Sequence, residues 1–155
     1  MSTRQKTQSP RSQTSAELAL ADYQLLAEFR HVLARFLAFS ADAARAAGLA
    51  PRQHQALLAI KGHPRGTPVT VGDLADRLAI RHHSAVGLVD RLAEGGYLVR
   101  RTDLQDRRRA VLSLTPAGEQ ALAALSAVHR EELRRIAPLL GPLLKQLGPT
   151  EPPSP

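Results

Sequence analysis

The chain lacks cysteine and contains a single methionine, Met1. The absence of cysteine excludes disulfides, thiolate zinc sites, iron–sulfur clusters and cysteine nucleophiles. With Met1 alone, a switch driven by methionine oxidation is excluded as well. Aromatic residues make up only 3% of the sequence, which argues against a large pocket lined by aromatic rings.

Long hydrophobic runs are also absent. The longest nearly uncharged apolar stretch is Ile136–Leu144, which contains two prolines and a glycine and is far too short to span a membrane. Residues 1–15 are polar and basic and lack the apolar core of a secretion signal. We therefore expect a soluble, cytoplasmic protein with no membrane partner.

Basic residues exceed acidic ones by 21 to 14, which gives a formal net charge of +7. Only three of the basic residues are lysines, and the rest are arginines, the planar donors suited to phosphates and base edges. A length of 155 residues supports one compact domain with appendages. Residues 1–13, rich in polar residues, and 148–155, rich in proline, are predicted to be disordered tails.

A helix of about thirty residues is predicted over 14–48. It begins with a capping-box pattern, Thr14 to Glu17, and ends at Gly48, a plausible C-cap. Apolar residues recur at helical spacing in two rows, namely Leu18, Leu25, Phe29, Val32, Phe36 and Phe39, and Leu26, Leu33 and Leu37. A helix this long and apolar requires partners on more than one side. We favour a subunit interface over a purely intrachain core helix, because the rest of the chain is too small to cover it.

Three shorter helices are predicted next, over 51–62, 70–78 and 82–94, with a short strand near Val69. In the last of them Val86, Val89 and Leu92 are expected to face the core. The tight connection around Ile80 makes the second and third of these helices a helix-turn-helix candidate, which on spacing alone is weak evidence.

A β-hairpin is predicted directly after this candidate. The strand-like runs 97–99 and 110–114 flank a polar, arginine-rich loop over 100–109, an arrangement typical of a wing. A fifth helix follows from Thr115-Pro116, with Leu122, Leu125, either Val128 or His129, Leu133 and Ile136 on one face. The final apolar segment, 139–147, is predicted to be broken by Pro142.

These residues resemble the MarR family of bacterial winged helix-turn-helix regulators. The most specific match is the run 103–118, DLQDRRRAVLSLTPAG, which is similar to the wing signature of the family. LVDRL at 88–92 with Gly96, and LAPRQ at 49–53 with Leu57-Leu58, are similar to its recognition helix and second helix. The resemblance implies a mainly α fold with a small β-hairpin wing. It divides the chain into a DNA-binding region over 49–115 and dimerisation helices over 14–48 and 116–147.

Two positions depart from the family pattern. Arg81 stands where many members have a serine, threonine or aspartate that caps the recognition helix, so the cap is either missing or supplied by Ser84 or a shifted start. Gly87 occupies a DNA-facing position where a longer polar residue is common. A glycine inside a helix costs about 1 kcal/mol relative to alanine, so Gly87 either permits a close approach or is simply tolerated.

The resemblance implies that residues 82–94 enter the major groove and that the wing, 100–109, enters the minor groove. Asp106 would orient Arg108 in the minor groove, while Arg107 and Arg109 meet phosphates. The alternative is that the charged residues of this helix and hairpin form an ordinary solvent-exposed face that binds nothing. A metal site at the adjacent histidines is disfavoured, because neighbouring helical side chains point about 100° apart. The expected DNA-binding residues are Arg81, His82, His83, Ser84, Gly87, Arg91, Arg101, Asp106, Arg107, Arg108 and Arg109.

The resemblance also implies a homodimer on double-stranded DNA, most often a repressor, which a small anionic or phenolic effector releases. A cleft for such an effector would be lined by Tyr23, His31, Arg35, Phe36 and His54, each of which is otherwise plain packing or surface. No cofactor or metal is implied. The alternatives are a weakly specific or architectural DNA-binding protein and, remotely, an enzyme. The chain has no serine elbow, no phosphate-binding glycine loop and no paired carboxylates outside the wing.

Overall fold

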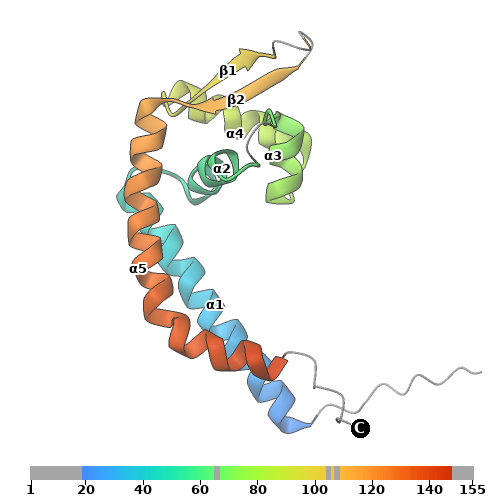
Figure 1. Cartoon of the computed structure of the whole chain (residues 1–155), viewed down its shortest axis with the longest axis vertical. Helices are drawn as coiled ribbons and strands as arrows, with labels where there is room; N and C mark the ends of the chain where they lie inside the picture. The colour runs from blue at the N-terminus through green and yellow to red at the C-terminus, as the bar shows by residue number, and fades with distance from the viewer. Residues whose placement is uncertain (1–18, 65–66, 104–105, 107–108, 148–155) are drawn as a thin grey trace, which may run out of the picture.

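The computed structural model describes residues 19–64, 67–103, 106 and 109–147. Two long helices, α1 (Leu20–Ala46) and α5 (Pro116–Leu147), run beside each other below a smaller unit (Figure 1). This unit contains α2 (Pro51–Lys61), α3 (Val71–Leu78), α4 (His82–Glu94) and an antiparallel hairpin of β1 (Leu98–Thr102) and β2 (Ala110–Leu114). Mainly α with one β-hairpin, the fold is the predicted winged helix-turn-helix class.

The short helices begin and end at the residues that their capping chemistry favours. Pro51 is the first residue of α2, and the Ala50 amide donates to Gln53 Oε1 at 2.8 Å. At α3 the Thr70 amide and hydroxyl both donate to Asp73 Oδ2, and Thr70 Oγ accepts from the Asp73 amide. These hydrogen bonds from Thr70 hold the pKa of Asp73 below its usual value.

The hairpin pairs Leu98 with Leu114 and Thr102 with Ala110. Strand β1 therefore extends through Thr102, three residues into the segment predicted as loop, because the antiparallel ladder continues to that point. The strand predicted near Val69 is not found among the described residues. Val69 instead accepts one hydrogen bond, 2.8 Å long, from the Leu112 amide at the edge of β2.

One core lies beneath the hairpin and between α2, α3, α4 and the upper part of α5. Its fully buried side chains include Leu57, Leu74, Val89, Leu92 and Leu98. Leu122 and Leu125 of α5 join this core, so the long helix is packed against the winged unit. Burial of this apolar surface fixes the positions of α4 and the wing relative to each other.

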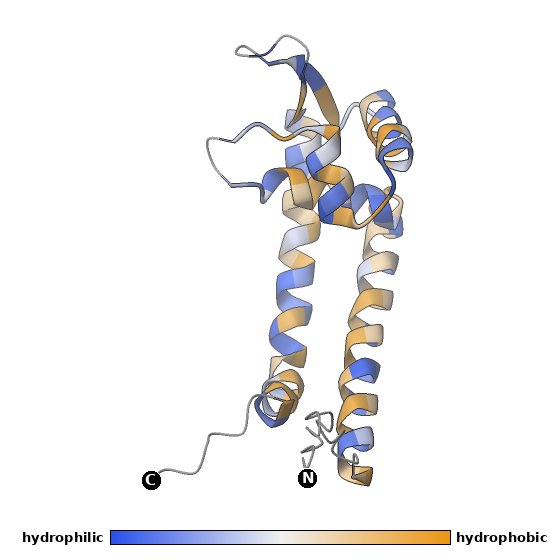
Figure 2. Ribbon diagram, turned by 90° about the vertical axis from the view of Figure 1, so that its right-hand side faces the viewer, coloured by the Kyte–Doolittle hydropathy of each residue, from blue (hydrophilic) through white to orange (hydrophobic). Residues whose placement is uncertain are grey.

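The long helix α1 begins within the predicted segment and ends where predicted. The capping pattern at Thr14 lies outside the described residues, and the described helix starts after Ala19, whose amide donates to Asp22 Oδ2 at 2.8 Å. Gly48, just past the helix end, adopts a φ of +78°, which glycine tolerates. Figure 2 shows hydrophobic residues along much of α1. Among them Leu26, Leu33 and Leu37 are 46%, 40% and 53% exposed.

The predicted break at Pro142 is wrong, because α5 continues through Pro138 and Pro142 to Leu147. A proline removes a backbone donor and bends a helix without always ending it. The C-terminal part of α5 accordingly runs at an angle to its beginning (Figure 1).

The buried residues of α5 agree with the predicted row at its two ends and differ from it in the middle. Leu122, Leu125 and Ile136 are buried, whereas Leu133 is 44% exposed and therefore lies outside the predicted row. Of the two alternatives in the middle of the row, His129 is half-buried and Val128 is 47% exposed.

No helix in the described ranges is long and apolar enough to cross a bilayer.

Candidate nucleic-acid interface

The beginning of α4 presents exposed polar side chains and free backbone donors. Arg81, His82, His83 and Ser84 are all exposed. Arg81 is the N-cap residue and makes no side-chain capping hydrogen bond. The first amides of α4 therefore lack a side-chain cap from Arg81, and they form the positive end of the helix dipole. Such an end favours an anionic group such as a phosphate.

The inner face of α4 holds this surface outward. Ala85, Leu88, Val89 and Leu92 are buried, while Val86 is only half-buried. Val89 and Leu92 face the core as predicted. At the start of the helix the buried side chain is Ala85 rather than the predicted Val86, because Ala85 lies on the same side of the helix as Leu88 and Leu92.

Gly87 lies beside Arg91 on the outer side of α4. A Cβ placed on Gly87 would lie 3.5 Å from Nη1 of Arg91, which is ordinary van der Waals contact. The Arg91 guanidinium therefore extends back one turn over the glycine. A larger side chain at position 87 would displace this group, so the pairing of Gly87 with Arg91 shapes the middle of the exposed face.

The hairpin is joined to α4 by an ion pair. Arg100 Nη2 of β1 lies 2.6 Å from Oδ1 of Asp90 on α4, and the two side chains are 39% and 48% exposed. Arg101 follows on the opposite face of the strand and is exposed. Arg100 thus contributes to the orientation of the wing, whereas Arg101 is available to solvent or a ligand. The sequence showed the positive charge of Arg100 but not its partner, ten residues away.

At the tip of the hairpin the described residues form a turn. The Arg109 amide donates to the Asp106 carbonyl at 2.9 Å, and the Asp103 amide donates to the Arg109 carbonyl at 3.0 Å. Asp106 and Arg109 are exposed. Arg107 and Arg108, which carry the predicted phosphate and minor-groove contacts, lie outside the described residues.

The base of the wing is fixed to α5 by the Thr-Pro-Ala-Gly segment, 115–118. The Thr115 hydroxyl donates to the Gly96 carbonyl at 2.6 Å and accepts from the Gly118 amide at 3.1 Å. A Cβ on Gly118 would overlap the Tyr97 carbonyl oxygen. These contacts explain in physical terms why this motif needs a threonine and a glycine, which sequence analysis had recognised only by resemblance.

Two residues of the predicted effector cleft, His54 and Phe36, both contact His129 at the junction of α1, α2 and α5. His54 is 4% exposed, and its ring centroid lies 4.6 Å from that of His129. Phe36 contacts the same histidine edge-on at 6.1 Å. The sequence predicts for His129 only an alternative place on the apolar face of the helix, because nothing in its spacing indicates that it meets a second histidine.

The other three predicted effector residues, Tyr23, His31 and Arg35, are exposed on α1. Arg35 lines a small hollow of about 20 Å³ with Val32, Arg135, Ile136 and Leu139. That volume is about the size of one water molecule. In this single chain Phe36 and His54 both contact His129, but no cavity found among the described residues is lined by all five predicted residues.

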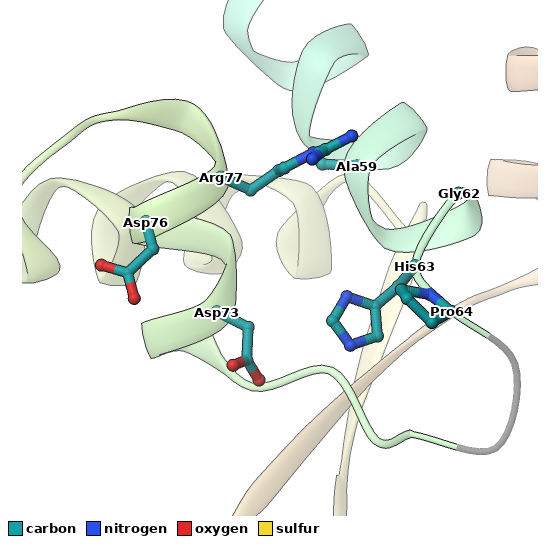
Figure 3. Close-up of a pocket in the computed structure, with 7 residues that line it drawn as sticks. All are labelled: Ala59, Gly62, His63, Pro64, Asp73, Asp76 and Arg77. Carbon is teal, nitrogen blue, oxygen red and sulfur yellow. The ribbon is translucent and has the colours of Figure 1, made fainter.

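A larger cavity, about 480 Å³, lies elsewhere, between α2 and α3. Figure 3 shows Asp73 and Asp76 on α3, the His63 ring across from them, and Arg77 directed toward α2. Nothing in the sequence indicates this cavity. The Asp73 carboxylate already accepts two hydrogen bonds from Thr70, so part of the polar lining serves to cap α3. No cluster of His, Asp and Glu suited to a metal ion occurs in the ranges described above.

The amino-acid sequence of the chain is similar to that of known proteins. A model of the MarR family matches residues 47–109. An uncharacterized HTH-type transcriptional regulator of Bacillus subtilis, YcgE, is 34% identical over 84 residues, which cover 54% of this chain and 53% of that protein. The chain spans between 53% and 61% of the length of the curated relatives that it matches.

Solved structures share the fold. A mutant of S. aureus MepR bound to an oligodeoxyribonucleotide matches with a TM-score of 0.62 at 20% identity, over 81% of this chain and 98% of that one. CouR from Rhodococcus jostii bound to p-coumaroyl-CoA matches with a TM-score of 0.66 at 23% identity, over 84% and 93%. Residues 47–109, which run from the end of α1 to the wing, are thus similar to the MarR family, and the matched relatives are HTH-type transcriptional regulators.

Proposed function

We propose that the chain is a dimeric, sequence-specific DNA-binding transcriptional regulator. The observation that carries this proposal is the exposed, uncapped N-terminus of α4 beside an arginine-bearing hairpin, the two joined by the ion pair of Asp90 with Arg100. A helix of this kind fits the major groove, and the adjacent hairpin reaches the flanking minor groove.

Each exposed group has a defined role in this proposal. Arg81 and the first amides of α4 bind phosphate, while His82, His83, Ser84 and Arg91 face base edges. Arg101, Arg107 and Arg109 contact the backbone, and Asp106 orients Arg108 in a narrow minor groove. Gly87 leaves room for Arg91 at the centre of the face.

A second copy of the chain completes the regulator in this proposal. One recognition helix reads only a few base pairs, whereas a twofold dimer reads two half-sites about one helical turn apart. The exposed leucines of α1 and of the C-terminal part of α5 supply an apolar surface that a monomer would leave in water. They are Leu20, Leu26, Leu33, Leu37, Leu139, Leu144 and Leu147. The proposed dimerisation segments are 14–48 and 116–147, and the winged region is 49–115.

We also propose repression as the mode of regulation, with release of DNA by a small effector. CouR, which shares the fold, is seen with the acyl thioester p-coumaroyl-CoA, and this supports an anionic or aromatic ligand as the class to screen. In this proposal the ligand enters between the long helices and the winged unit, where Phe36 and His54 lie.

The second candidate function is weakly specific or architectural DNA binding. It is favoured by Gly87, which places no polar side chain of its own at the centre of the exposed face of α4. Such a protein would bind through phosphate contacts and discriminate little between sequences.

Selection from a random duplex library distinguishes these two functions. The full chain is incubated with the library, and the bound DNA is recovered and sequenced over several rounds. A regulator enriches a palindromic motif whose half-sites are about one helical turn apart. Retention of DNA without any enriched motif would favour the architectural function, and no retention would contradict both.

A further inference from the structure

The junction between the winged unit and the long helices contains two stacked histidines. His54 lies on α2 and His129 on α5, with ring centroids 4.6 Å apart and ring planes inclined by 36°. Phe36 and Phe39 of α1 contact the His129 ring edge-on, at 6.1 and 5.9 Å. The histidine pair is therefore a direct contact between the winged unit and the two-helix part.

The hydrogen bonds of His129 fix where its protons lie. Nδ1 is 2.6 Å from the Leu125 carbonyl oxygen, which can only accept, so Nδ1 donates. Nε2 is 2.7 Å from Ser40 Oγ on α1, a group that can donate or accept. His129 can therefore be neutral or charged without losing either hydrogen bond.

His54 is more deeply buried than its partner. Its side chain is 4% exposed, whereas His129 is half-buried. Burial, and secondarily the charge of His129, hold the pKa of His54 below its ordinary value of 6.5. A proton on His54 is thus accommodated poorly while the rings remain stacked.

Few charges are placed to compensate a second proton. On α1 the groups at the His129 ring are Phe36, Phe39 and Ser40, none of them ionised. The charged side chains nearest in sequence on α2 and α5 are Arg52, Arg130, Glu131 and Glu132. The first three are exposed, and the two carboxylates are paired with arginines, Glu131 with Arg134 at 3.3 Å and Glu132 with Arg135 at 2.6 Å. Two stacked imidazolium rings would repel each other without a neutralising partner.

We propose that the His54–His129 stack is a proton-sensitive latch, closed while His54 is neutral and opened when both rings are charged. Opening releases α2 from α5 and loosens the winged unit on the long helices. The consequence for DNA rests on the proposed function. In the dimer, opening of the latch would disturb the spacing of the two recognition helices and so weaken DNA binding under acid conditions.

The sign of the pH dependence follows from the location of the proton. The opened junction exposes His54 to water, where it binds a proton below about pH 6.5, whereas the closed junction resists that proton. The closed form is therefore fully favoured above this pH and progressively lost as the pH falls below it.

Hydrogen exchange of the α2 amides tests the latch without DNA. Exchange rates, corrected for the intrinsic effect of pH, are compared at about pH 7.5 and 5.5 for the full chain and for His54→Phe, which keeps a buried ring but cannot be protonated. We expect acidification to raise α2 exchange by about tenfold in the wild type and by less than about twofold in the variant. His129→Gln, which retains a hydrogen-bonding side chain and leaves His54 in place, is the second variant; because burial is the main cause and the charge of His129 the lesser one, it should keep part of the response. An equal response in the wild type and in His54→Phe would overturn the latch.

A DNA-binding measurement connects the latch to function. His82 and His83 are kept, because any effect that they have on binding is common to the wild type and to His54→Phe. Affinity for a duplex selected by the wild type should fall about tenfold more between pH 7.5 and 5.5 in the wild type than in His54→Phe. An unchanged pH profile after His54→Phe would overturn the link to DNA. Absence of any DNA binding would instead contradict the proposed function and leave the exchange experiment as the test of the latch.

Discussion

At the scale of single residues, the base of the wing shows how a motif is determined by close packing. Gly118 sits where α5 begins, with its α-carbon against the Tyr97 backbone. The Thr115 hydroxyl is hydrogen-bonded on both sides of this contact. The sequence predicted that a helix begins here, but the need for glycine arises from the backbone of Tyr97, which precedes β1 and lies about twenty residues earlier in the chain. This need could not be predicted from local propensity.

Replacing Gly118 by alanine should therefore be strongly destabilising. The new methyl group would overlap the Tyr97 carbonyl, so either α5 or β1 must move. We expect the free energy of unfolding to fall by about 2–4 kcal/mol, measured by urea denaturation.

Gly141→Ala is the matched control, because Gly141 lies in the same helix and nothing lies within 4 Å of the position of its Cβ. This change should leave stability unchanged or raise it by up to about 1 kcal/mol. A similar loss in both variants would contradict the packing account of Gly118.

At the scale of elements, the periodicity of apolar residues and the positions of capping residues, proline and glycine predicted most of the fold. Pro51, Thr70 and the glycines after α4 predicted helix boundaries that the structure confirms. Two of the errors lie where tertiary contacts override local signals. Strand β1 is lengthened by its pairing with β2, and Val69 receives one hydrogen bond rather than a full strand ladder.

Candidate-site residues were predictable from the sequence as groups on a helix or a hairpin, but their partners were not. The pairing of Asp90 with Arg100 depends on how the hairpin folds back toward α4. The stack of His54 and His129 joins helices that are far apart in the chain. Contacts of this kind depend on tertiary packing, which a local pattern does not encode.

The ion pair between α4 and the wing should matter more for binding than for stability. Because both side chains are substantially exposed, Asp90→Ala should reduce the free energy of unfolding by less than about 1 kcal/mol. A double-mutant cycle with Arg100→Ala, read by both urea denaturation and DNA affinity, should give a larger coupling for DNA binding. Zero coupling in the affinity cycle would contradict the role of this pair in orienting the wing.

At the scale of the whole molecule, the long helices carry more apolar surface than one chain covers. Leu26, Leu33 and Leu37 are spaced along one stripe of α1 and are each at least 40% exposed. On a soluble protein such a stripe indicates a partner, and we propose a second copy of the chain.

Leu33→Glu should convert the proposed dimer to a monomer, because an isolated carboxylate would be buried in the interface. Sedimentation equilibrium measures the change directly. Ala38→Glu is the matched control, since Ala38 is exposed and lies about 140° around the same helix from Leu33. Dimers of unchanged affinity in Leu33→Glu would show that this stripe is not the interface.

The central claim is that α4 and the wing together read a DNA sequence. The most direct test is the equilibrium affinity of the full chain for the DNA upstream of its own coding region and for random duplex, measured at two salt concentrations. We predict discrimination of about 10³-fold or more, with affinity for both duplexes falling steeply as salt rises. The contradicting result would be that neither the upstream DNA nor any duplex recovered by selection binds more tightly than random duplex.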